Sequence, residues 1–153
     1  MKLEKLHGIA LGMLALLAAP AWAEAERFAV TDPTYRAECG SCHVAYPPQL
    51  LDARAWQAIM AGLDRHYGSD ASLDAKTAAA IRSYLGTSAG RKPAGSSNGL
   101  PRITEARWFV REHDEIPAAT WKSDAVKSAS NCGACHPRAD QGDYSERGVR
   151  VPK

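Results

Sequence analysis

Two short motifs constrain this chain more than any other feature. Each is a pentad in which two cysteines, three positions apart, are followed at once by a histidine: Cys39-Gly40-Ser41-Cys42-His43 and Cys132-Gly133-Ala134-Cys135-His136. Residues at i, i+3 and i+4 fall on one side of a helical turn. Two thiols can then add to the vinyl groups along one porphyrin edge while the imidazole reaches the iron from the same side. The pentads therefore predict two covalently attached c-type haems, held through Cys39, Cys42, Cys132 and Cys135.

Other uses of the four cysteines compete with haem attachment. The thiols could ligate one structural zinc ion, or the pairs could form disulfides or redox-active sites. Neither alternative requires a histidine directly after each pair. With 5 histidines in 153 residues, finding one after both pairs by chance has odds of roughly one in a thousand. Haem attachment uses the whole motif and makes His43 and His136 the proximal iron ligands.

The N-terminus has the pattern of a cleaved export signal. A lysine-containing start precedes an apolar run over 9–19 and a small-x-small cleavage site at 21–23. This run is shorter than the roughly twenty residues that cross a bilayer, which favours cleavage over membrane anchoring. We expect residues 1–23 to be removed, the mature chain to begin at Glu24, and the protein to be periplasmic.

The charge balance excludes one class of partner. Removing Lys2, Lys5 and Glu4 with the leader from the 19 basic and 17 acidic residues leaves 17 and 16. Nucleic-acid binding needs a concentrated basic face, and a chain so close to neutral gives no case for one. Two haems would add roughly four propionate charges, so the holoprotein is expected to be acidic and to suit a basic docking partner.

Two spare histidines supply candidate distal ligands. His66 lies 23 residues after His43, and His113 lies 23 residues before His136. A closed haem iron takes a sixth ligand, so one spare imidazole in each half predicts bis-histidine ligation. Pairing within each half is the simplest assignment, and a crossed arrangement stays open. Met60, the rival ligand, falls on the apolar face of a predicted helix and is interpreted as core packing.

Apolar spacing predicts two helices in the first half. One covers 51–66, with Gly68 as its stop. The other covers 73–85, opened by Ser72 as N-cap and closed by Gly86. Both have the three-to-four residue periodicity of a helix with one buried face.

The second half has weaker helical signals. After a stretch rich in Gly, Ser and Pro, Thr104 is predicted to cap a short helix ending near His113, and Ser123 to open one that runs into the second pentad. No stretch alternates like a strand. We therefore predict a mainly α chain: a small cytochrome-c-like helical haem domain at 24–86, a linker or surface loop at 87–101, and a loop-rich, partly helical second haem domain at 102–153.

Six stretches together resemble a known family: 35–43, 46–48, 60–66, 108–113, 126–136 and 142–148. The chain is similar there to the bacterial dihaem cytochromes c, and the resemblance fails only in the loop around 86–100. It implies bis-histidine ligation of both haems and electron transfer in the periplasm. It also implies redox partner proteins, namely a membrane cytochrome of the b type and, in some relatives, an oxygen-binding monohaem cytochrome.

These observations predict an electron carrier and not an enzyme. Two six-coordinate irons leave no open position for oxygen or peroxide. One alternative is a gas-binding or sensing protein in which His66 or His113 is displaced by a small ligand. Another is a dihaem peroxidase in which one haem opens, although such enzymes are longer and this chain leaves little room for a substrate pocket.

Overall fold

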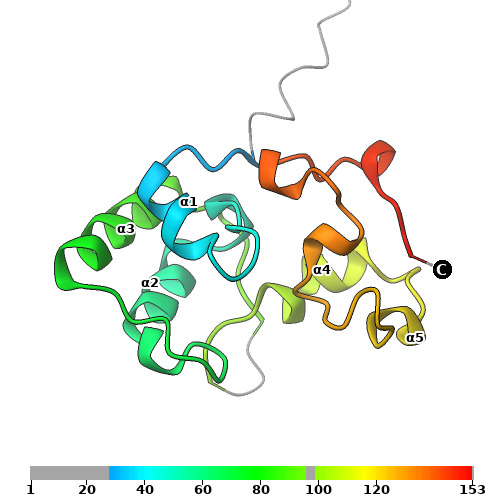
Figure 1. Cartoon of the computed structure of the whole chain (residues 1–153), viewed down its shortest axis with the longest axis horizontal. Coiled ribbons are helices and arrows are strands. Elements are labelled where there is room, and N and C mark those ends of the chain that lie inside the picture. The colour runs from blue at the N-terminus through cyan, green and yellow to red at the C-terminus, as the bar shows by residue number, and fades with distance from the viewer. Residues whose placement is uncertain (1–27, 96–98, 153) are drawn as a thin grey trace, which may run out of the picture.

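The protein is described here by a computed structural model that covers residues 28–95 and 99–152 (Figure 1). The predicted export signal, its cleavage site and Glu24 lie outside these residues. Within the described ranges the regular elements are α-helices and short 3₁₀ turns, and the only strand-like pairing consists of isolated bridges. The prediction of a mainly α fold is confirmed. No helix in the described ranges is both long and apolar enough to cross a membrane.

Three helices build the first half: α1 (Pro33–Cys39), α2 (Ala53–Ala61) and α3 (Ala75–Ser88). Helices α2 and α3 pack against each other, and α1 also contacts α3 (Figure 1). Each helix starts at an aspartate whose carboxylate accepts hydrogen bonds from N–H groups of the first turn: Asp32, Asp52 and Asp74. These caps satisfy backbone donors that a helix start otherwise leaves unpaired.

An apolar core between these helices positions the first pentad. Leu51 and Ile81 are fully buried, and the indole Nε1 of Trp56 donates to the Pro48 carbonyl at 2.7 Å. Tyr35 on α1 packs edge-on against Trp56, with 6.5 Å between ring centroids. Because α1 ends at Cys39, the packing of Tyr35 fixes where the pentad begins. Met60 belongs to the same core, as the sequence predicted.

The second half consists mostly of loops and short turns. Its elements are η4 (Ile103–Glu105), α4 (Arg107–Glu112), α5 (Ala118–Trp121), η5 (Cys132–Ala134), η6 (Ala139–Gln141) and η7 (Glu146–Gly148). Phe109 and Val126 are its largest buried apolar side chains. The predicted helical first part and loop-rich second part are both confirmed.

The predicted helix over 51–66 is shorter than expected. Helix α2 ends at Ala61, and Gly62 leaves the helix with φ −120°. A separate 3₁₀ turn, η3 (Leu63–Arg65), follows. A Cβ on residue 62 would lie 2.8 Å from the Leu100 side chain, so the glycine allows a distant segment to cross at this point. The break occurs there and not at Gly68.

The predicted helix over 73–85 is displaced towards the C-terminus. Its N-cap is Asp74 and not Ser72, because the Asp74 carboxylate accepts from the N–H groups of Lys76 and Thr77. Gly86 does not end the helix, which continues to Ser88. A Cβ on residue 86 would lie 3.4 Å from the Gln57 amide of α2, so the glycine sits in the contact between the two helices.

The predicted elements of the second half also differ in part. Thr104 lies inside η4, and α4 begins after Ala106 without a side-chain cap. The expected end near His113 is confirmed. The helix predicted to open at Ser123 is wrong: the segment forms successive turns, and Lys127 has a positive φ of 65° that a helix cannot contain.

The segment predicted as a linker is tied to both halves where it is described. The Gly90 N–H bonds to the carbonyls of Leu51 at 2.8 Å and Pro48 at 3.3 Å. Gly95 and Arg102 exchange two backbone hydrogen bonds of 3.2 and 2.7 Å. The division into domains at 87–101 stays a prediction.

Candidate functional site

The first histidine pair joins the end of α1 to the end of η3. His43 closes the first pentad, and His66 is the residue that caps η3. Their ring centroids lie 6.3 Å apart, and the two ring planes are inclined by only 16°. The early end of α2 therefore places His66 beside His43. A helix continuing past Ala61 would instead have carried His66 further along the α2 axis.

The second pair joins the end of α4 to the second pentad. His113 caps the C-terminus of α4, and His136 follows η5. Hydrogen bonds to the Cys132 carbonyl from the N–H groups of Cys135 (3.2 Å) and His136 (2.8 Å) close the pentad into a turn. The two rings lie 6.2 Å apart with 75° between their planes.

Both separations suit two imidazoles on opposite sides of one metal ion. Each metal–nitrogen bond is about 2 Å long, and the ring centre lies about 1.2 Å beyond that nitrogen. Two ligands on opposite sides of the metal therefore have their ring centres about 6 to 6.5 Å apart. The structure thus brings His43 together with His66, and His113 together with His136. Each pair lies within one half, in agreement with the simplest assignment.

One ring of each pair is oriented by a backbone carbonyl. His43 Nδ1 is 2.8 Å from the Val44 carbonyl oxygen, and His113 Nδ1 is 2.9 Å from that of Phe109. A ring that donates from Nδ1 keeps the lone pair of Nε2 free for a metal. These two carbonyls could not be recognised from the sequence, because any residue type supplies one.

The other ring of each pair has a buried nitrogen that lacks a partner. Nδ1 of His66 and Nδ1 of His136 make no hydrogen bond in the described part of the chain. Burial, and then the neighbouring His43, lower the pKa of His66; burial, and then His113, lower the pKa of His136. Both rings are therefore biased to the neutral form, which is the form that binds a metal.

Two of the four cysteine thiols are strongly affected by burial. Burial raises the pKa of Cys39 and of Cys132 to about 11, so without a metal both thiols are protonated at neutral pH. All four cysteines are free. No group of three or more His, Cys, Asp or Glu residues in the described ranges could hold a metal ion. The four thiols do not converge on one zinc site there.

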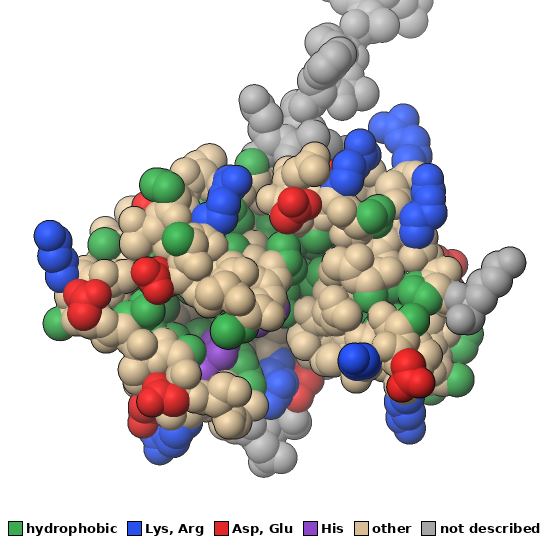
Figure 2. Space-filling model, viewed as in Figure 1, with side chains coloured by type: hydrophobic (Ala, Val, Ile, Leu, Met, Phe, Trp, Pro, Cys, Tyr) green, Lys and Arg blue, Asp and Glu red, His purple; other side chains and the backbone are tan. Residues whose placement is uncertain are grey.

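Aromatic rings lie against both pairs. Tyr46 stacks on His43 at 4.7 Å, and Phe109 stacks on His113 at 4.1 Å, each with 20° between planes. Tyr144 approaches His136 at 5.3 Å. Figure 2 shows histidine side chains recessed among hydrophobic atoms near the middle of one face. The pairs thus have apolar surroundings that suit a large flat ligand.

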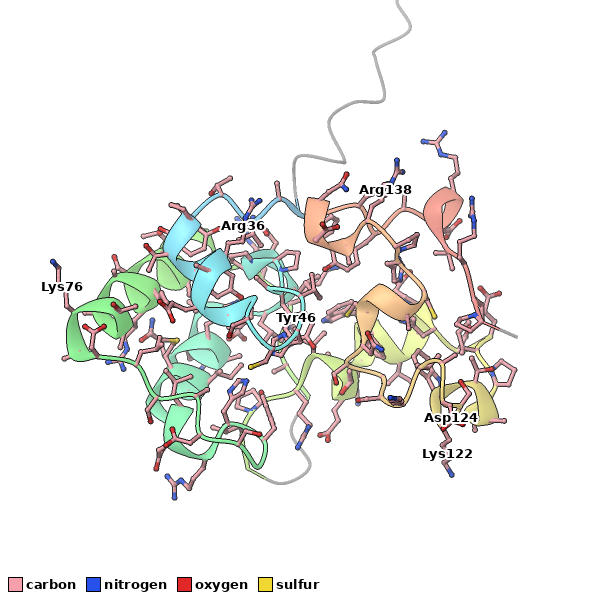
Figure 3. The ribbon with its side chains drawn as sticks, in the orientation of Figure 1. Arg36, Tyr46, Lys76, Lys122, Asp124 and Arg138 are labelled. Carbon is pink, nitrogen blue, oxygen red and sulfur yellow. The ribbon has the colours of Figure 1, made fainter. Side chains whose placement is uncertain are left out.

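Tyr46 also joins the two sites through a contact that no sequence pattern indicates. Its hydroxyl donates to the Ser130 carbonyl at 2.6 Å, two residues before Cys132. Its own carbonyl accepts from the Tyr35 hydroxyl at 2.7 Å. In Figure 3 it lies at the centre of the molecule, between the helical half and the loop-rich half.

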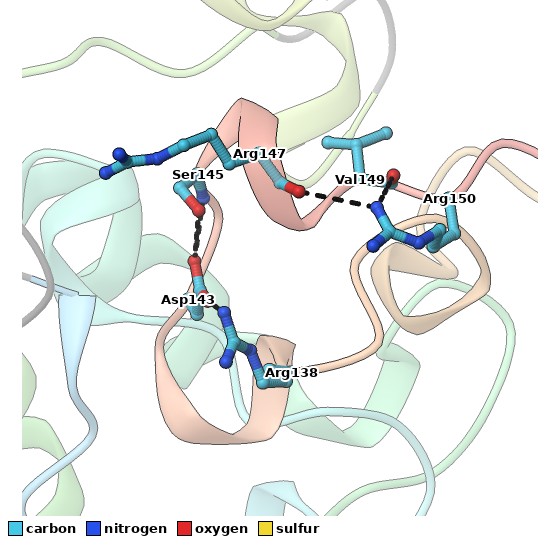
Figure 4. A network of polar contacts seen from close by, with 6 residues as sticks. All are labelled: Arg138, Asp143, Ser145, Arg147, Val149 and Arg150. Atoms are coloured by element: carbon cyan, nitrogen blue, oxygen red, sulfur yellow. Dashed lines mark hydrogen bonds and ion pairs between the residues drawn. The ribbon is translucent and has the colours of Figure 1, made fainter.

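The C-terminal segment is held against the second pentad. The Arg150 N–H donates to the Cys135 carbonyl at 2.8 Å. Its guanidinium donates to the carbonyls of Val149 (2.7 Å) and Arg147 (3.3 Å), and Arg138 pairs with Asp143 (Figure 4). This segment follows the short turn η7, and Val149 has an extended backbone conformation.

Comparisons with known proteins agree with this arrangement. The family model described as dihaem cytochrome c matches residues 35–144. A crystal structure of a dihaem cytochrome c from Shewanella baltica OS155 is 42% identical, with a TM-score of 0.71, and the match covers 78% of this chain and 92% of that one. A structure from Rhodobacter sphaeroides is 45% identical, with a TM-score of 0.67, covering 76% and 99%. A search of curated proteins gave no match. The chain belongs to the dihaem cytochrome c family, and its cofactors are two haem c groups.

Proposed function

We propose that this protein transfers electrons in the periplasm and that each haem iron is ligated by two histidines. His43 and His66 are the ligands of the first haem, and His136 and His113 those of the second. The observation that carries the proposal is the spacing of the two ring pairs, 6.3 and 6.2 Å, which suits two imidazoles on one iron. Family membership supports electron transfer as the general activity.

The haem supplies reversible one-electron chemistry, and the chain sets the conditions for it. The carbonyls of Val44 and Phe109 fix the orientation of His43 and His113. The rings of Tyr46 and Phe109 each cover one face of an imidazole, that of His43 and that of His113. Two histidines per iron favour lower potentials than a histidine and a methionine would.

The cellular setting belongs to the same proposal. The leader pattern at 1–23 supports export to the periplasm. A membrane b-type cytochrome is proposed as the electron donor, and an oxygen-binding monohaem cytochrome as an acceptor. The support for these partners is the family resemblance.

Carbon monoxide tests the ligation. Added to the reduced wild-type protein, it should leave the spectrum unchanged, because both irons are already six-coordinate. His66→Ala and His113→Ala should each convert one haem from low-spin to high-spin and bind one carbon monoxide per protein. Met60→Leu is the matched control, since Met60 lies in the core, and its spectrum should stay low-spin.

Other results would favour the alternatives. A stoichiometric carbon monoxide adduct in the wild-type protein would favour a gas-binding or sensing function. Rapid peroxide turnover would favour a peroxidase. A variant of His113 that stays low-spin would show that another residue ligates the second haem.

A further inference from the structure

A basic groove lies between the segment 91–95 and helix α4. It has a volume of about 670 Å³. Four cationic side chains line it, two from each wall, and Trp108 contributes an aromatic surface: Arg91 and Lys92 on one wall, Arg107 and Arg111 on the other. Glu105 is its one acidic lining residue. We call this surface the basic groove.

The four cations of the basic groove are exposed, and three of them make no ion pair within the described ranges. Arg91 and Arg107 make no ion pair or hydrogen bond with any residue that the structure describes. Lys92 Nζ lies 4.4 Å from the centroid of the Trp108 ring, a cation–π contact that leaves its charge available. Arg111 forms an ion pair with its chain neighbour Glu112, at 2.7 Å, which offsets part of its charge.

The local charge therefore differs from that of the whole molecule. The groove lining holds four cationic side chains against one carboxylate, that of Glu105, which also lies 3.5 Å from Arg102 outside the lining. The chain as a whole carries a formal charge of only +2. The basic partner expected from the net charge of the holoprotein would be repelled at this face, whereas an acidic one would be attracted.

The groove leads to the second haem ligand pair through aromatic contacts. Trp108 meets the buried ring of Phe109 with 6.0 Å between centroids, and Phe109 stacks on His113 at 4.1 Å. A molecule seated on Trp108 is thus two ring contacts from an imidazole of the second pair. Near the first pair, Arg65 precedes His66 in the chain and Arg102 lies 4.5 Å from the centroid of the Tyr67 ring. Each of these two arginines is paired with a carboxylate, that of Asp64 or Glu105.

We propose that the basic groove docks the acidic surface of a redox partner protein and makes the second haem the port for electrons. This rests on the proposed electron-transfer function. In the exchange the partner's reduced centre loses one electron and the ferric second haem gains it, and no proton or covalent bond is transferred. Arg91, Lys92, Arg107 and Arg111 steer the partner and hold it, while Trp108 gives it an apolar contact.

The test uses the haem-loaded protein and an acidic redox protein as probe. The rate at which a reduced plant-type ferredoxin reduces the oxidised protein is measured by stopped flow at low ionic strength. Arg107→Glu/Arg111→Glu should slow this reaction by about tenfold or more. Arg91→Glu/Lys92→Glu, on the opposite wall, should have the same effect, and both effects should vanish near 1 M salt, where charges are screened.

The matched control is Arg54→Glu/Lys76→Glu. These exposed cations lie on α2 and α3, outside the groove, and the net charge changes equally. In Figure 3 Lys76 is at the far end of the helical half. The control should alter the rate by no more than about twofold. Oxidation of the reduced protein by the small cation hexaammineruthenium(III) should become faster in the groove variants, which excludes general damage to the haem.

Three results would overturn the proposal or its premise. Equal slowing in groove and control variants would mean that only net charge matters. A changed potential of the second haem with an unchanged ferredoxin rate would mean that these cations pair with haem propionates inside the molecule. If the wild-type protein accepts no electron from reduced ferredoxin, the electron-transfer function itself fails. If the wild type is reduced and the charge-reversed groove variants react at the same rate, only the groove proposal is rejected.

Discussion

Tyr46 links the first histidine pair to the segment before the second pentad. Its ring lies parallel to His43, and its hydroxyl reaches the Ser130 carbonyl beside the second pentad. Burial, and then Cys132, raise the pKa of Tyr46 far above its usual value. The hydroxyl therefore stays protonated at neutral pH and remains a hydrogen-bond donor.

Replacing Tyr46 by phenylalanine tests this link. Tyr46→Phe removes one hydrogen bond and should lower the free energy of unfolding by about 0.5–1.5 kcal/mol. Amide exchange around Ser130 should become faster, while the haem spectrum stays unchanged because the ring is retained. Tyr84→Phe is the control: its hydroxyl accepts from the Thr31 N–H within the first half, so exchange around Ser130 should not respond. Equal stability and exchange in wild type and Tyr46→Phe would mean that water replaces the bond.

The candidate ligands could be predicted from the sequence, but their surroundings could not. His66 and His113 stand out because few histidines remain once the pentads are assigned. The Tyr46–Ser130 bond joins residues 84 positions apart, and no local pattern signals such a contact. The carbonyls that orient the rings could not be predicted either, because every residue carries a carbonyl group.

Helix positions were predicted well and helix ends poorly. The apolar periodicity locates α2 and α3, because one face of each is buried against the other. Their ends depend on competition between neighbouring candidates. Both Ser72 and Asp74 are good N-cap residues. Asp74 is the observed N-cap, and its carboxylate accepts hydrogen bonds from two backbone N–H groups. Gly86 stays helical although its helix propensity is weak, and a Cβ at this position would lie 3.4 Å from the Gln57 side chain of α2.

The Asp74 cap predicts a pH dependence for α3. Hydrogen bonds from Thr77, first from its side chain and then from its backbone, lower the pKa of Asp74 below its usual 3.8. A carboxyl whose pKa is lower in the folded state stabilises the fold above its unfolded pKa and loses that contribution as pH falls through the folded value. Asp74→Asn keeps a capping oxygen but cannot titrate in this range.

Thermal unfolding of Asp74→Asn as a function of pH checks this expectation. The wild type should be more stable than the variant by a constant margin from pH 5 to 7, and the margin should shrink below about pH 4. Asp124→Asn removes one exposed negative charge that is not the N-cap of a described helix, and it serves as control. A margin that persists to the lowest pH would contradict the role of the Asp74 carboxylate.

The two halves of the molecule hold their histidine pairs in different ways. In the first half a core that includes Leu51, Trp56 and Ile81 fixes the helices around the pair. In the second half the pair is held by short turns and by a small number of buried apolar residues, among them Phe109 and Val126. The two pairs accordingly have similar separations but different orientations, with ring planes at 16° and 75°.

This difference predicts two distinct electron paramagnetic resonance signals from the oxidised protein. Nearly parallel imidazoles donate π density to the same iron d orbital, which splits the d levels and gives a rhombic low-spin signal. Nearly perpendicular imidazoles act on both orbitals alike and give a signal dominated by one large g value. We therefore expect the His43–His66 haem to be rhombic and the His113–His136 haem to show the large g value. His66→Ala should remove the rhombic signal alone, and His113→Ala the other alone. Two identical signals would mean that haem insertion rotates one pair of rings away from the orientation seen here.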